Sequence, residues 1–147
     1  PNGAFDLFLE SHAKFKQMQD TWGIALAHVN LGRVMRRCGY LQEATDHHLE
    51  AIQILASTRL TWLMADNLVE VAMLFYESKE MQRSIEILDF VLQYPASTPQ
   101  SLQRAQNYQQ QIISRHAELA LASSSHISLQ TDIKALNVLV AAQLAKL

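Results

Sequence analysis

The sequence contains few of the residues that cross-link a chain or turn it sharply. Its 147 residues include one cysteine, Cys38, so no disulfide can form within the chain and nothing indicates an oxidising compartment. Four glycines and three prolines are too few for the frequent turns of an all-β fold. The glycines are also scattered, and none belongs to a Walker-type phosphate-binding loop. These shortages argue against a disulfide-rich protein, an all-β protein and a Walker-type nucleotide site in this chain.

The sequence also lacks an excess of charge of one sign. Charged residues make up 18% of the chain and the formal net charge is −2, so there is no basic footprint for nucleic acid. Hydrophobic residues reach 49%, which predicts a folded domain of ordinary size. Residues 1–20 lack the charged start and apolar core of a signal peptide, and polar residues interrupt the last apolar stretch, 129–146. We therefore expect a cytoplasmic protein without direct nucleic-acid contact and without a membrane span.

Helix-forming residues dominate instead, and they are arranged in a repeat. Thr21-Trp22 recurs as Thr61-Trp62, 40 positions later. The same offset relates further residues of matching type: Leu31 and Val71, Gly32 and Ala72, Met35 and Phe75, Ala44 and Ser84, Ile52 and Leu92. A register held over whole segments predicts pairs of antiparallel helices, each of which needs neighbours of its own kind to bury its apolar face.

This pattern predicts an all-α fold of about seven helices. Asp20 is the predicted N-cap of one helix, and Gly39 is expected to end that helix in a left-handed conformation. Pro95 blocks continuation of a later helix, and Thr98-Pro99 is typical of a new helix start. The predicted helices span residues 4–18, 21–38, 41–56, 60–78, 81–93, 100–122 and 129–146.

The spacing of Leu31-Gly32, Met35, Ala44 and Ala51 resembles the signature of tetratricopeptide (TPR) repeats. The resemblance implies a TPR-like α-solenoid of antiparallel helix pairs, with the first helix of each pair lining a concave groove. The chain departs from the family pattern at several positions: His28 stands for Trp, Met35 for Tyr, His48 for the second-helix aromatic, and Ala56 for Pro. Its period is also longer than the roughly 34 residues of the plain repeat.

Residues 20–27, DTWGIALA, resemble the C-terminal TPR-like arrays of large bacterial signal-transduction ATPases and transcriptional regulators. Because the chain also begins with Pro1 rather than Met, we expect it to be a C-terminal fragment of a longer protein. Residues 1–147 then form a single helical repeat domain. Its expected parts are the second helix of a truncated repeat (1–19), two repeats (20–57 and 58–94), a degenerate repeat helix (98–122) and a capping helix (128–147).

The potentially reactive residues form no recognisable chemical motif. His47 and His48 are adjacent on a predicted helix, so their side chains point about 100° apart and cannot easily hold one metal ion. No CxxC pair and no zincin-like histidine array is present. Cys38 aligns with Ser78 in the repeat, which favours a packing role over a nucleophile. We expect no metal, no cofactor and no catalytic residues, and a helical enzyme or metal protein is the weakest hypothesis.

Arg33, Arg36 and Arg37 are spaced to form one stripe on the first helix of a repeat. The TPR resemblance places this stripe in the concave groove, where it would bind an extended or helical segment with acidic residues. The predicted binding face comprises Leu26, Val29, Arg33, Arg36, Arg37, Asp66, Val69, Met73 and Tyr76. The alternative is a solvated face whose arginines pair with Glu70 or Glu77. Val29 and Met73 stand where a carboxylate clamp needs polar residues, which disfavours a receptor for chaperone tails.

Three functional hypotheses follow. The first is a non-catalytic scaffold that binds a protein or peptide ligand, or upstream domains of the same chain, as the sensor region of a bacterial regulatory protein. The second is a structural adaptor that self-associates through the ends of the solenoid, and the apolar helix 128–147 could form a homodimer or simply cap the stack. The third is the enzyme or metal protein named above.

Overall fold

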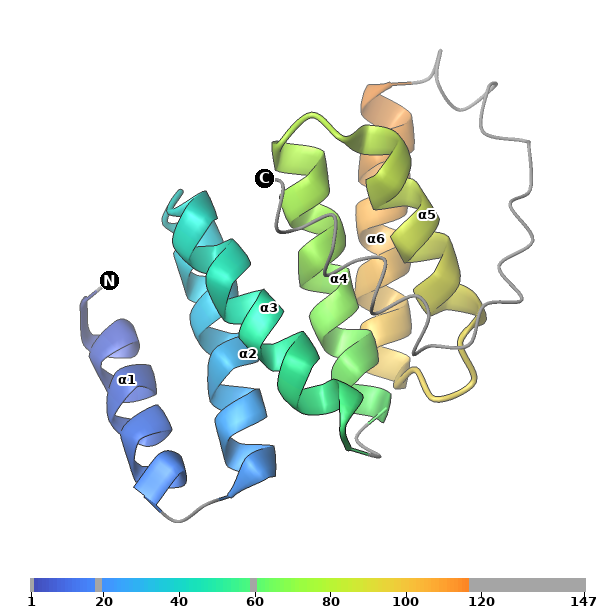
Figure 1. Ribbon diagram of the computed structural model, residues 1–147. Helices are drawn as coiled ribbons and strands as arrows, with labels where there is room; N and C mark the ends of the chain where they lie inside the picture. Colours follow the sequence, from blue (N-terminus) through green and yellow to red (C-terminus); the bar gives the residue numbers. More distant parts are fainter. Residues whose placement is uncertain (1, 18–19, 59–60, 117–147) are drawn as a thin grey trace.

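The computed structural model describes residues 2–17, 20–58 and 61–116, which form α-helices and contain no strand (Figure 1). The helices are α1 Asn2–Gln17, α2 Thr21–Arg37, α3 Leu41–Ala56, α4 Thr61–Glu77, α5 Met81–Gln93 and α6 Pro99–Arg115. The expected all-α class is confirmed for these ranges, and α1 to α5 lie within a few residues of their predicted bounds. The helix predicted for residues 100–122 ends earlier, at Arg115, and His116 is its C-cap. The predicted capping helix 128–147 and the end of the segment 98–122 lie outside the described residues.

The two central helical hairpins repeat each other in detail. The helices α2 and α4 begin at positions 21 and 61, and α3 and α5 begin at 41 and 81, so the offset of 40 found in the sequence recurs. Both hairpins turn through a residue with positive φ, Gly39 at 86° and Lys79 at 70°. In both, the next residue donates its backbone N–H to the carbonyl five residues earlier: Tyr40 to Met35 at 3.0 Å and Glu80 to Phe75 at 2.8 Å. These are the bonds of a Schellman motif, which satisfies carbonyls at the helix end.

Two helix starts have the predicted side-chain caps. The Asp20 carboxylate accepts a hydrogen bond from the backbone N–H of Gly23 at 3.1 Å. The Thr98 hydroxyl accepts one from the N–H of Ser101 at 3.1 Å, and Pro99 occupies the first turn of α6. Each cap satisfies one of the backbone donors that a helix start leaves unpaired.

The helices pack against their neighbours in sequence, and α4 also contacts both α2 and α6 (Figure 1). The helix α4 therefore lies between α2, α3, α5 and α6, and all its residues from 67 to 75 are buried. Most of them are apolar, since a helix covered on every side must be apolar around its circumference. Asn67 and Glu70 are the exceptions, and both are fully buried.

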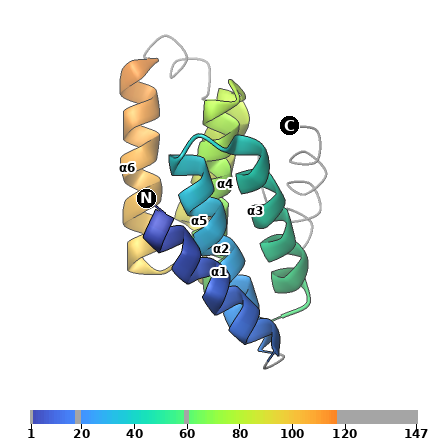
Figure 2. The ribbon, with the colours of Figure 1, turned by 90° about the vertical axis from the view of Figure 1, so that its left-hand side faces the viewer.

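The first helix is attached differently. Among the described helices, α1 contacts only α2; it lies at one end of the row of helices in Figure 1 and in front of α2 in Figure 2. None of its described side chains belongs to the buried core, and Leu7 and Leu9 are 65% and 42% exposed. The part of the chain that the structure describes contains no helix with the length and apolar character that crossing a membrane requires.

Candidate functional site

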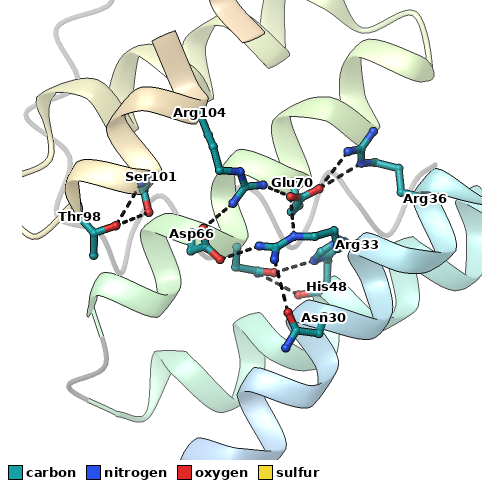
Figure 3. Close-up of polar contacts among 10 residues, drawn as sticks. Asn30, Arg33, Arg36, His48, Asp66, Glu70, Thr98, Ser101 and Arg104 are labelled. Carbon is teal, nitrogen blue, oxygen red and sulfur yellow. Dashed lines mark hydrogen bonds and ion pairs between the residues drawn. The ribbon is translucent and has the colours of Figure 1, made fainter. Parts of the chain in front are cut away.

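Three arginines from two helices converge on two carboxylates of α4 (Figure 3). From α2, Arg33 donates through Nη2 to Asp66 Oδ2 at 2.7 Å and through Nε to Glu70 Oε1 at 2.8 Å. From α6, Arg104 bonds the same two carboxylates, with Nη1 at 2.5 Å from Asp66 Oδ1 and Nη2 bonded to Glu70 Oε1. The carboxylates of α4 therefore connect α2 to α6. We call this set, with Arg36 and Glu77, the ion-pair network.

Glu70 is the buried centre of the ion-pair network. Its side chain is 0% exposed, and its second oxygen, Oε2, accepts from Nε and Nη2 of Arg36 at 3.2 and 3.1 Å. Arg36 is itself 7% exposed and also donates through Nη1 to Glu77 at 2.6 Å. A carboxylate out of contact with water is stable only when its lone pairs are taken up by donors, so each of these bonds compensates desolvation. Removing one partner would leave charge buried without compensation.

One part of the ion-pair network is buried, and the other part is partly exposed to solvent. Arg33 and Arg104 are 25% and 21% exposed, Asp66 is 21% exposed, and Glu77 is 31% exposed. Burial lowers the pKa of the Arg104 guanidinium, and the negative charge of Asp66 opposes that change. The partly exposed groups remain accessible to a ligand, whereas Glu70 serves to hold them in place.

The charged residues of the predicted binding face fall into two groups: those in the ion-pair network, and Arg37. Arg33, Arg36 and Asp66 meet in the ion-pair network, and the arginines make the pairs with Glu70 and Glu77 that the sequence left open as an alternative. Arg37 is exposed and makes no ion pair with any described residue. Among these seven residues, the four arginines Arg33, Arg36, Arg37 and Arg104 outnumber the three carboxylates Asp66, Glu70 and Glu77 by one.

The apolar residues of the predicted binding face are mostly in the interior. Val29 and Val69 are fully buried and Met73 is 8% exposed, so these three pack in the core beneath the charged groups. Leu26 and Tyr76 are half-buried and pack against that core. Only Leu26 and Tyr76 among them present surface to a ligand.

Arg104 was not predicted, because the repeat register offered no signal for it: the equivalent position one repeat earlier is Met64. A second buried polar pair was missed as well. His48 donates from Nδ1 to Asn67 Oδ1 at 2.6 Å, and both residues are fully buried. Burial lowers the pKa of His48 to about 4, so its ring is neutral near pH 7. Its signal in the sequence is its place at the second-helix aromatic position of the TPR-like motif.

His48 and Gly32 fit together by size. A Cβ added at Gly32 would lie 2.6 Å from Nε2 of His48, closer than two such atoms can approach. Nε2 has no hydrogen-bond partner among the described residues. Position 32 therefore needs a glycine, because α2 and α3 pack closely there.

The described residues offer no metal site, since no group of three or more His, Cys, Asp or Glu side chains among them is arranged to hold an ion. Cys38 is exposed at the end of α2. Comparisons with protein-family models, with curated proteins and with solved structures return no significant match. The resemblance to TPR proteins therefore rests on the residues quoted from the sequence, and it stays a prediction.

Proposed function

We propose that this chain is a non-catalytic, TPR-like scaffold that binds a protein or peptide segment on the face formed by α2, α4 and α6. The observation that carries the proposal is the ion-pair network, which draws partly exposed charged groups from three helices onto one face. Such a face presents its hydrogen-bonding groups in fixed positions, so a ligand meets a site that is already ordered. We place the protein in the cytoplasm.

The charges on this face favour a ligand with an acidic residue. The exposed Arg37 follows Arg36 on α2, adds a positive charge near Arg104 of the ion-pair network and makes no ion pair with any described residue. A guanidinium binds a carboxylate through two parallel hydrogen bonds, which adds geometric specificity to charge attraction. Tyr76 and Leu26 supply half-buried apolar surface on the same helices.

The proposed place of this activity is the sensor or interaction region of a bacterial regulatory protein. Support comes from residues 20–27, whose sequence resembles the TPR-like arrays of such regulators. Ligand binding would then alter the contacts that this domain makes with upstream domains of the same chain.

The test is selection of random peptides displayed on phage against the purified chain, followed by affinity measurements on the selected peptides. We expect enrichment of peptides with Asp or Glu, and a loss of about tenfold or more in affinity with Arg37→Glu. Arg83→Glu is the matched control, because Arg83 lies on α5 and pairs only with the exposed Glu80 among the described residues. Equal effects of the two substitutions, or no acidic preference, would contradict the proposal.

A structural adaptor that self-associates is the second candidate function. The observation in its favour is the outer surface of α1, where Leu7 is 65% exposed and Leu9 is 42% exposed at one end of the molecule. The homodimer predicted through the segment 128–147 lies outside the described residues. Sedimentation of the wild type and of Leu7→Glu tests the idea: a dimer that Leu7→Glu dissociates supports it, and a monomer at all concentrations rejects it.

A further inference from the structure

Three histidines from three successive helices form a continuous chain of contacts. Nε2 of His12 on α1 lies 3.0 Å from Nε2 of His28 on α2. On the other side of the same ring, Nδ1 of His28 lies 3.1 Å from Nδ1 of His47 on α3. The ring centroids are 4.6 and 5.2 Å apart, and all three side chains are half-buried. We call His12, His28 and His47 the histidine chain.

The geometry limits how many protons the histidine chain can hold. When all three rings are neutral, each contact needs one N–H and one bare nitrogen, and a single direction of donation satisfies both contacts. One added proton is also tolerated, because a charged His28 can donate to both neighbours. A second added proton would force two N–H groups to face each other across about 3 Å in at least one of the two contacts.

The charged groups around the histidine chain do not remove this limit. On α1, Glu10 and Lys14 pair with each other at 2.6 Å. On α3, Asp46 and Glu50 flank His47, yet burial and His12 lower the pKa of His47 against the attraction of these two carboxylates. On α2, Arg33 is positively charged and pairs with Asp66 and Glu70, so it does not stabilise a protonated histidine.

The contact matters because the described apolar side chains of α1 are at most half-buried, as Phe5 and Phe8 are. Its described side chains contribute nothing to the buried core, and it contacts α2 alone among the described helices. A helix with few buried apolar contacts opens with a small free energy, so a polar contact weighs more here than in the centre of the molecule.

We propose that the histidine chain is a pH-sensitive joint that holds α1 against the α2–α3 hairpin at neutral pH and releases it in mild acid. Free histidines bind protons below about pH 6.5, so the released state takes up more protons than the docked state. Docking is therefore strongest above that pH and weakens as the pH falls below it. Each extra proton taken up on release multiplies the released population by up to about tenfold per pH unit.

Hydrogen exchange of the α1 amides, with EDTA present to exclude metal ions, tests this inference on the whole chain. After correction for the intrinsic pH dependence of exchange, the opening constant of α1 should rise about fivefold between about pH 6.5 and 5.5 for one extra proton. The buried amides of α4 report global unfolding in the same experiment, and they should open far less than α1 at both pH values.

Substitutions distinguish the acid-induced release of α1 through the histidine chain from a general loss of stability in acid. His12→Gln and, independently, His28→Gln retain a hydrogen-bonding side chain without titration, and each should reduce the acid-induced rise in α1 exchange. His116→Gln is the control, because His116 contacts Tyr76 at 3.2 Å, away from α1, and it should leave the rise unchanged. A wild-type α1 whose opening does not change with pH, or an undiminished rise in both α1–α2 variants while α4 stays protected, would overturn the inference.

Discussion

The hairpins α2–α3 and α4–α5 have the same frame and different polar residues. Their helices start 40 positions apart and their turns use the same hydrogen bonds. The polar positions, however, are not repeated. The second hairpin has Asp66 and Glu70 where the first has Leu26 and Asn30, and the first has Arg33, Arg36 and His48 where the second has Met73, Tyr76 and Leu88.

This difference shows that the frame and the contacts between hairpins are encoded separately. Caps and turns depend on residues close together in the chain, so each copy can form them alone. The arginines of the first hairpin and the carboxylates of the second have partners only when α2 lies beside α4. Opposite charges on the two copies therefore favour this neighbour and disfavour the pairing of like copies.

We expect the largest loss of stability from removing the charge of Glu70, a residue of the second hairpin that the first hairpin replaces with Asn30. Glu70→Gln keeps the size of the side chain but removes a fully buried charge that compensates three arginines. We expect the free energy of unfolding, measured with urea, to fall by about 3–5 kcal/mol. Glu80→Gln is the matched control, because its ion pair with Arg83 is exposed and contributes about 1 kcal/mol or less. Equal losses in the two variants would contradict a buried role for Glu70.

A smaller effect on stability depends on pH and comes from His48, which the second hairpin replaces with Leu88. His48 has a pKa of about 4 in the folded protein against 6.5 for the free side chain, so the unfolded chain binds a proton that the folded chain refuses. Stability is full above about pH 6.5 and falls with the pH until about 4, by roughly 3 kcal/mol in total from this group.

Urea titrations of the wild type and of His48→Leu across this pH range check that value. The substitution gives α3 the residue that α5 has at the equivalent position, Leu88. It also removes the donor to Asn67, which lowers stability at every pH, so the measured quantity is the slope with pH. The slope of the variant should be shallower than that of the wild type, and identical slopes would show that His48 is not the responsible group.

The third effect tests the contact that distinguishes Gly32 from its counterpart Ala72. Gly32→Ala places a methyl group against the His48 ring, which is fully buried and held by Asn67. Overpacking costs about 1–3 kcal/mol, and the gain in helix propensity returns about 1 kcal/mol at most. Thermal or urea unfolding should therefore show a net loss. Gly3→Ala on α1, which has no atom within 4 Å of the added methyl, is expected to be neutral or stabilising.

The smallest effect exchanges the turn residues of the two hairpins. Lys79 has a φ of 70°, a conformation that glycine adopts without strain, so Lys79→Gly should stabilise the chain by about 0.5–1 kcal/mol. Gly39→Lys, which gives the first turn the residue of the second, should destabilise it by a similar amount. Unfolding curves of the two variants measured together check the opposite signs, and shifts of the same sign would contradict the argument.

The sequence by itself determined the described helices, their order and most of their ends; the end of α6 at Arg115 is the exception. Asp20, Gly39 and Thr98 act on backbone groups within a few residues of themselves, so their effects could be predicted from local spacing. The offset of 40 also predicted that the helices of the two hairpins start at equivalent positions. The sequence also predicts the arginine stripe, but it does not decide whether the arginines pair with Glu70 and Glu77 or bind a ligand.

Only the tertiary structure decided which polar groups meet. Arg104 reaches Asp66 across 38 positions in the chain, and His12 reaches His47 through His28 on a third helix. These contacts depend on which helices become neighbours and on how each is rotated about its axis, and neither is set by spacing within a helix. The burial of Val29 and Val69 beneath the charged face has the same origin. Local chemistry sets the elements of this protein, and the packing of those elements sets its charged face and its histidine chain.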